Sequence, residues 1–151
     1  MMAQPNSFKG RLVMVNSYLE LMRVSPTDRI QMIRAVPTVA RAKALAHELG
    51  IAESILLNDL GIPAKAGNAT RLPVAASERL LGLMTMIGRV DAMVLSMDAS
   101  IEFDAARWLG SWLNSPLPAL GGARPGSYLD TMTGQEMLAA LLEMARSGAY
   151  A

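Results

Sequence analysis

The sequence predicts an all-α protein in which N-terminal helices of a degenerate helix-turn-helix type are joined by a long central helix to a small helical C-terminal domain. Three observations support this fold class. Apolar residues recur with helical spacing over most of the chain, glycines and prolines mark the ends of these segments, and no stretch alternates as a strand does. The expected divisions are residues 1–73, 74–97 and 98–151.

Length and composition limit the classes of protein that this chain can be. It has 151 residues, enough for one ordinary domain or two small ones that share a core. Hydrophobic residues make up 52% and charged residues 18%, which is too apolar for a disordered chain. The sequence has no cysteine, so a disulfide scaffold and a thiolate metal site are both excluded.

The most apolar run, residues 80–88, is shorter than the roughly 20 residues that cross a bilayer. We therefore expect it to be part of a buried core helix and expect no membrane contact. The first eleven residues are followed by no apolar block of signal-peptide length. Together these observations favour a cytoplasmic protein.

Charge is distributed unevenly along the chain. Residues 1–89 hold 11 of the Lys and Arg residues and 6 of the Asp and Glu residues, a net charge of +5. Residues 90–151 hold 3 Lys and Arg residues and 7 Asp and Glu residues, a net charge of −4. A basic first part and an acidic second part indicate two different partners.

The first apolar segment, residues 12–22, is too apolar for an isolated surface helix, and we interpret it as a possible dimer contact. A helix is expected to begin at Pro26, capped by Ser25, and to end before Pro37. The next helix is expected over residues 38–49, with Gly50 after it.

A fourth helix is expected over residues 52–60, before Gly61. Leu-Gly-Ile occurs after each of these two helices, a pattern typical of a helix-turn-helix cluster. The following segment, residues 63–71, would be the recognition helix. Gly67 and Asn68 are poor helix formers, so we expect this helix to be short or frayed.

The longest helical pattern covers residues 74–94, and Ser77 is expected to cap it. Apolar residues occupy nearly its whole circumference, which indicates a helix in the middle of the molecule. Beyond it, Asp98, Glu102 and Asp104 are interpreted as carboxylates at a helix start, where the helix dipole favours them, rather than as metal ligands.

The C-terminal part is predicted to be two helices with a Pro- and Gly-rich connector between them. The first helix, from about residue 101, ends at Asn114, because Pro116 disfavours helical geometry before it. The connector covers residues 116–130, and its Gly121-Gly122 pair is a turn rather than a phosphate loop. The second helix is expected to begin with a capping box of Thr133 and Glu136 and to end at Gly148.

Two tryptophans lie one turn apart on the first of these helices. We expect Trp108 in the core, whereas Trp112 fits a core position and a partner-binding position equally well. No nucleophile and base pair, metal cluster or nucleotide loop can be found in the sequence. The chain is therefore expected to be no enzyme and to need no cofactor and no metal.

An ordered set of short motifs resembles the C-terminal toxin-binding domain of the MbcA/ParS/Xre antitoxins, and this likeness covers the chain weakly from about residue 44 and strongly after residue 105. The motifs are Trp112-Leu113, Pro116, Ala119-Leu120-Gly121-Gly122, Arg124-Pro125, Leu129-Asp130-Thr131, Gly134 and Gly148-Ala149-Tyr150-Ala151.

The resemblance implies the antitoxin of a type II toxin–antitoxin pair. Its partner would be a toxin with a RES domain that degrades NAD or transfers ADP-ribose from it, and the C-terminal domain would occlude the NAD pocket. The expected toxin-binding residues are Trp112, Leu117, Leu120, Arg124, Tyr128, Arg146, Tyr150 and Ala151. For Arg124 we favour a structural role, in which its side chain bonds backbone carbonyls of the connector, over an ion pair with the toxin.

The alternative function is that of a DNA-binding repressor that regulates its own operon through the N-terminal part. It would be a homodimer, because a symmetric operator needs two half-site readers. In the family the recognition segment carries a Ser/Thr-rich turn and paired arginines. This sequence keeps only Lys65, Thr70 and Arg71 as candidate operator contacts.

Overall fold

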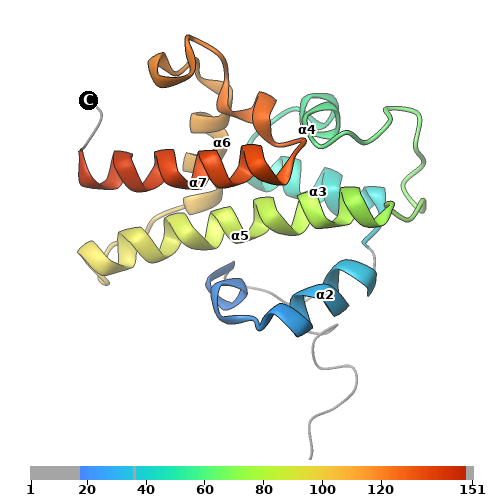
Figure 1. Ribbon diagram of the computed structural model, residues 1–151, viewed down its shortest axis with the longest axis horizontal. Helices are drawn as coiled ribbons and strands as arrows, with labels where there is room; N and C mark the ends of the chain where they lie inside the picture. Colours follow the sequence, from blue (N-terminus) through green and yellow to red (C-terminus); the bar gives the residue numbers. More distant parts are fainter. Residues whose placement is uncertain (1–17, 36, 149–151) are drawn as a thin grey trace, which may run out of the picture.

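The structure, a computed structural model of the chain, describes residues 18–35 and 37–148 and is all-α, as expected (Figure 1). Its elements in chain order are η1 (Tyr18–Arg23), α2 (Pro26–Ala35), α3 (Val39–Leu49), α4 (Glu53–Asp59), α5 (Val74–Met97), α6 (Ala105–Asn114), η2 (Pro118–Leu120), η3 (Pro125–Tyr128) and α7 (Met132–Ser147).

Helix α5 runs through the middle of the molecule and contacts η1, α2, α6 and α7 (Figure 1). Leu80, Leu83 and Ile87 are among its fully buried side chains, and one hydrophobic cluster extends from η1 to α7. The helix is long and apolar enough to cross a membrane, although 44% of its most apolar window is buried within the protein. Its four neighbours identify it as the core helix that the sequence predicts.

The helices between residues 26 and 60 form as the sequence predicts. The backbone N–H of Asp28 donates to the Ser25 hydroxyl at 3.1 Å, so Ser25 caps α2. Gly50 ends α3 in the left-handed conformation, with φ 74°. The N–H groups of Gly50 and Ile51 donate to two carbonyl oxygens of the last turn of α3. Helices α3 and α4 pack on each other, and α3 also contacts α6.

The segment after α4 differs from the expected recognition helix, because no helix forms between Asp59 and Val74. Its backbone instead contacts the start of α3: Val39 N–H donates to Thr70 O at 2.9 Å and Ala40 N–H to Asn68 O at 3.1 Å. These carbonyls satisfy two N–H groups that the first turn of a helix leaves without a partner. Residues 61–73 therefore fold as a loop that caps α3.

Two further expectations about the N-terminal half need correction or restriction. Ser77 does not cap α5; it is the fourth residue of this helix and is buried, and its hydroxyl donates to Ile33 O of α2 at 2.8 Å. The expected dimer segment, residues 12–22, lies mostly outside the described residues. Its last part is in η1, where Leu21 is buried against the core of the same chain.

Candidate functional site

The helical pair α6 and α7 and the connector between them hold most of the residues that the sequence singles out. Asp104 caps α6, because its carboxylate accepts the N–H of Arg107 at 2.9 Å. The helix therefore begins four residues later than the apolar pattern from Ile101 indicates. Leu109 and Leu113 are fully buried, whereas Ile101 precedes the helix and is exposed.

Helix α7 begins at a different cap from the predicted one. The hydroxyl of Thr131, not Thr133, accepts the N–H of Gly134 at 2.9 Å, and Met132 is the first helical residue. Thr133 lies inside the first turn, and both it and Glu136 are exposed. The capping-box prediction is therefore wrong by two residues, although Gly148 ends the helix as expected, with φ 73°.

Asp98 also has a different role from the one expected. It follows the last residue of α5, and its carboxylate accepts the N–H of Ser100 at 2.9 Å and the hydroxyl of Ser100 at 2.6 Å. These two hydrogen bonds lower the pKa of Asp98. The Asp98 carboxylate thus closes a turn after α5 and stays charged. Of the three carboxylates expected at a helix start, Asp104 is the one that caps a helix.

Arg124 ties the connector to the N-terminal half, but through side chains rather than the backbone carbonyls that we favoured. Its guanidinium donates from Nη2 to Asp59 Oδ1 at 3.0 Å and from Nη1 to Asn114 Oδ1 at 3.0 Å. Asp59 is the last residue of α4 and Asn114 the last of α6. The Arg124 side chain therefore joins the ends of two helices to the connector.

The Asp59 carboxylate is almost completely buried, with its side chain 4% exposed. Burial raises its pKa, and the hydrogen bond and positive charge of Arg124 act in the opposite direction. Because a buried charge needs a partner, the guanidinium is committed to this carboxylate. An intramolecular role is thus visible for Arg124, whose side chain is one-third exposed.

The two tryptophans of α6 stack on each other, with ring centroids 6.4 Å apart and an angle of 13° between the ring planes. Trp112 is half-buried and packs against the core. Trp108 is 39% exposed, so the prediction that it belongs to the core is wrong. The buried stripe of α6 is centred on Leu109 and Leu113, and Trp108 lies at its open edge.

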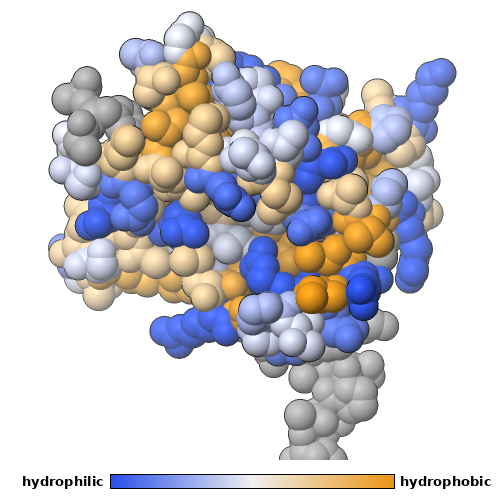
Figure 2. Space-filling model, in the orientation of Figure 1, coloured by the Kyte–Doolittle hydropathy of each residue, from blue (hydrophilic) through white to orange (hydrophobic). Residues whose placement is uncertain are grey.

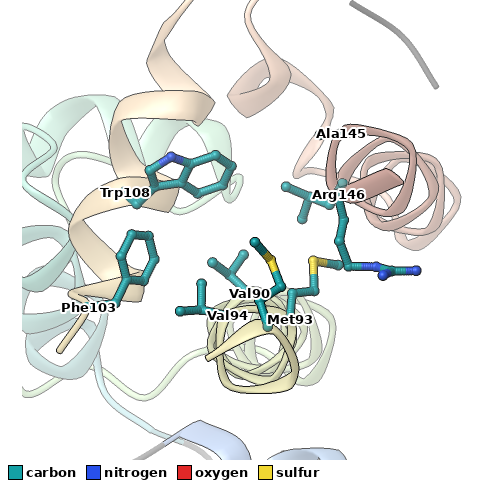
Figure 3. A pocket seen from close by; sticks show the side chains of 9 residues that line it. Val90, Met93, Val94, Phe103, Trp108, Ala145 and Arg146 are labelled. Carbon is teal, nitrogen blue, oxygen red and sulfur yellow. The ribbon is translucent and has the colours of Figure 1, made fainter. Parts of the chain in front are cut away.

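Trp108 forms one wall of a groove of about 210 Å³ at the end of the bundle (Figure 3). Its lining residues come from the second half of α5, the segment before α6, the first turn of α6 and the last turns of α7; they are Val90, Met93, Val94, Met97, Phe103, Trp108, Leu142, Ala145 and Arg146. Figure 3 shows the Trp108 and Phe103 rings on one side and α5 and α7 opposite them. The alkyl part of Arg146 lines the groove, and its guanidinium points away from the rings.

The remaining predicted toxin-binding residues lie on or beside the connector. Leu117, Leu120 and Tyr128 are half-buried against the core. Figure 2 shows hydrophobic side chains gathered over the connector and hydrophilic ones over the neighbouring face of α7. Arg146 is exposed and forms an ion pair with Glu143 at 3.1 Å. Tyr150 and Ala151 lie outside the described residues.

The groove residues on α5 and Phe103 were not predicted from the sequence as a site. One signal was available, because Phe103 is an aromatic residue flanked by two acidic residues in the short segment between α5 and α6. The α5 residues gave no such signal, since apolar residues surround that helix on almost every side.

The candidate DNA contacts, Lys65, Thr70 and Arg71, are all exposed on the loop of residues 61–73. This loop brings Thr70 and Arg71 together with the start of α3, where Arg71 forms a backbone bridge with Thr38. Among the described residues, no group of three or more acidic or histidine side chains is placed to hold a metal ion.

Comparison with known proteins gives two matches. Residues 101–148 match the family described as the antitoxin Xre/MbcA/ParS C-terminal toxin-binding domain. The chain is also 37% identical over 140 residues to a curated protein of Sphingobium sp. (strain YBL2), named Prs ADP-ribosylating antitoxin. That alignment covers 89% of this chain and 88% of the relative. No solved structure matches the chain.

Proposed function

This chain belongs to the Xre/MbcA/ParS antitoxin family, and we propose that the toxin it neutralises has a RES domain and acts on NAD. The observation that carries the proposal is the match of residues 101–148 to a toxin-binding domain. The name of the Sphingobium relative, which refers to ADP-ribosylation, supports a toxin that uses NAD. The antitoxin and toxin would act in the cytoplasm as a type II pair.

The proposed mechanism of inhibition is occlusion of the NAD pocket by the C-terminal domain. A pocket for NAD must bind two phosphates and is expected to be basic. The net charge of −4 on residues 90–151 would attract and orient such a surface. Half-buried apolar side chains of the connector, Leu117, Leu120 and Tyr128, would supply contact area beside it.

Coexpression with the product of the neighbouring gene tests this function. The complex is purified by a tag on one partner, and NAD turnover is measured with and without this chain. We expect a stable complex without NAD turnover and an active toxin once the antitoxin is removed. The absence of both a complex and an effect on NAD would contradict the antitoxin proposal.

Operator DNA is the second candidate partner. The first 89 residues carry a net charge of +5, and Lys65 and Arg71 are exposed on the loop that caps α3. We propose that a homodimer presents two such loops to a symmetric operator. A gel shift on the chain's own promoter should weaken steeply as salt rises, because phosphate contacts release counterions. A shift that is absent or insensitive to salt would contradict this role.

A further inference from the structure

The groove between α5, α6 and α7 is surrounded by exposed apolar side chains. Ten large hydrophobic residues are exposed in the described part of the chain. Three of them line the groove: Met97, Phe103 and Trp108. Three more, Leu95, Ile101 and Met144, are within two positions of a lining residue in the sequence. Met97 is 73% exposed and Phe103 is 39% exposed. Apolar side chains gathered at one end of a small protein mark an interaction surface.

The margin of this groove is acidic. Asp98, Glu102 and Asp104 are exposed in the segment that leads from the last residue of α5 to α6, and Phe103 lies among them. Asp98 and Asp104 are held by hydrogen bonds to their own turns. Arg146, the basic residue of the groove lining, is already paired with Glu143. Arg107, exposed in the first turn of α6 near Asp104 and Phe103, adds one positive charge, so residues 98–107 carry three negative charges and one positive charge, a net charge of −2.

This charge pattern decides between a second copy of the chain and a different protein as the occupant. In a twofold dimer the same patch of both copies meets, so two sets of Asp98, Glu102 and Asp104 would lie in one interface. Like charges at an interface disfavour that pairing. An occupant with an apolar centre and basic residues around it complements both the floor and the margin.

We propose that this groove is a docking site for the toxin and that it receives an apolar or aromatic side chain flanked by Lys or Arg residues on the toxin surface. The inference rests on the proposed function and extends it. The docking site crosses the start of the matched domain, because Val90, Met93 and Val94 of α5 form one wall. Toxin recognition would then involve the central helix as well as residues 101–148.

The aromatic wall is suited to an energetic anchor. The indole of Trp108 is stacked on Trp112, which is itself half-buried against the core, so the Trp108 ring is held in place before the partner arrives. Fixed aromatic side chains lose little conformational freedom on binding and are frequent hot spots. Trp108 should therefore contribute more to the affinity than any single aliphatic residue of the groove.

The test uses the full chain and the toxin encoded beside it, with titration calorimetry of the purified proteins. Trp108→Ala should raise the Kd of the complex about 30-fold, the range expected of a hot-spot residue. Glu102→Lys should raise the Kd about tenfold and reduce its dependence on salt. The matched control is Ile55→Ala, an equally exposed apolar residue on α4, which should leave the Kd unchanged.

Thermal unfolding of each variant shows whether it is folded. We expect all three variants to fold, because the substituted side chains are exposed. Failure of the unmodified chain to bind the toxin would overturn the proposed function itself. Binding by the unmodified chain with the same Kd for Trp108→Ala and Glu102→Lys would overturn only the groove proposal. A concentration-dependent dimer that Met97→Glu dissociates would also overturn it, because the groove would then be covered by a second copy.

Discussion

The guanidinium of Arg124 lies 3.0 Å from the carboxylate of Asp59, a residue 65 positions earlier in the chain. This ion pair connects α4 with the connector before α7. The same guanidinium also donates to the side chain of Asn114, the last residue of α6. It therefore joins a helix of the basic N-terminal part to the connector that carries several predicted toxin contacts. Its removal should affect stability before it affects any surface.

The variant Arg124→Ala should lower the free energy of unfolding by about 3 kcal/mol at neutral pH, because it leaves the Asp59 carboxylate buried without its partner. The measurement is urea denaturation. Asp59→Asn is the comparison: it removes the buried charge and should be less damaging than Arg124→Ala. Equal stability of Arg124→Ala and the unmodified chain would contradict the structural role of the pair.

The stability defect of Arg124→Ala should shrink as the pH falls. Burial raises the pKa of Asp59, and Arg124 lowers it. In the folded Arg124→Ala variant the pKa of Asp59 should therefore be higher than in the unmodified chain. For a carboxyl group with a raised pKa, the stabilising contribution is present below the unfolded pKa and is lost as the pH rises through the folded pKa. Denaturation midpoints at pH 7 and pH 5 measure this difference, and a defect of the same size at both values would contradict it.

Gly110→Ala should destabilise the contact between α3 and α6. A Cβ atom at Gly110 would lie 1.8 Å from the carbonyl oxygen of Leu49, so the two helices would have to move apart. Overpacking of this kind lowers the free energy of unfolding by about 2 kcal/mol or more. Gly67→Ala is the control, because its nearest neighbour would be at an ordinary 3.7 Å. A thermal melt of the two variants distinguishes them, and similar Tm values would argue against this close approach.

The cap of α7 gives a sharp comparison between two threonines. Thr131→Ala should lower the free energy of unfolding by about 1 kcal/mol, because the hydroxyl that accepts the Gly134 N–H is lost. Thr133→Ala, two residues further into the helix, should change it by a few tenths at most. Chemical denaturation of both variants decides the matter. A larger loss for Thr133→Ala would restore the capping box that the sequence indicates.

Deletion of residues 149–151 tests the proposed role of Tyr150 and Ala151 in occlusion. Gly148 is kept, because its left-handed conformation ends α7. We expect the shortened chain to melt at the same temperature and still to bind the toxin, while NAD consumption by the toxin returns. The assay is NAD turnover at a fixed ratio of antitoxin to toxin. Full inhibition by the shortened chain would remove these residues from the mechanism.

Local rules account for the parts of the fold that the sequence predicts well. Ser25, Pro26 and Gly50 each act through their own backbone neighbourhood, and the structure has the caps and ends that they indicate. Thr131 and Thr133 are equally good caps by the same rules. Only the path of the connector, which leaves Thr131 outside the helix and Thr133 inside it, separates them.

The errors at Ser77, Arg124 and Trp108 have a different cause, because distant parts of the chain determine each one. Ser77 donates to Ile33, a residue 44 positions away, and Arg124 reaches Asp59. Apolar spacing places Trp108 on the same helix face as the buried leucines but does not show how wide the covered part of that face is. The width of the covered face depends on how α3, α5 and η3 pack against α6, which is a property of the assembled fold.

The groove also bears on how toxin specificity can be exchanged among relatives. Its walls come from both sides of residue 98: Val90, Met93 and Val94 precede it, and Phe103 and Trp108 follow it. A chimera that takes residues 98–151 from a relative and keeps this α5 would have one groove wall from each protein. If the toxin docks at this groove as proposed, the unit to exchange between toxin–antitoxin pairs is the C-terminal segment together with the second half of α5. A crossover at residue 101, where the family match begins, would join groove walls of different origin.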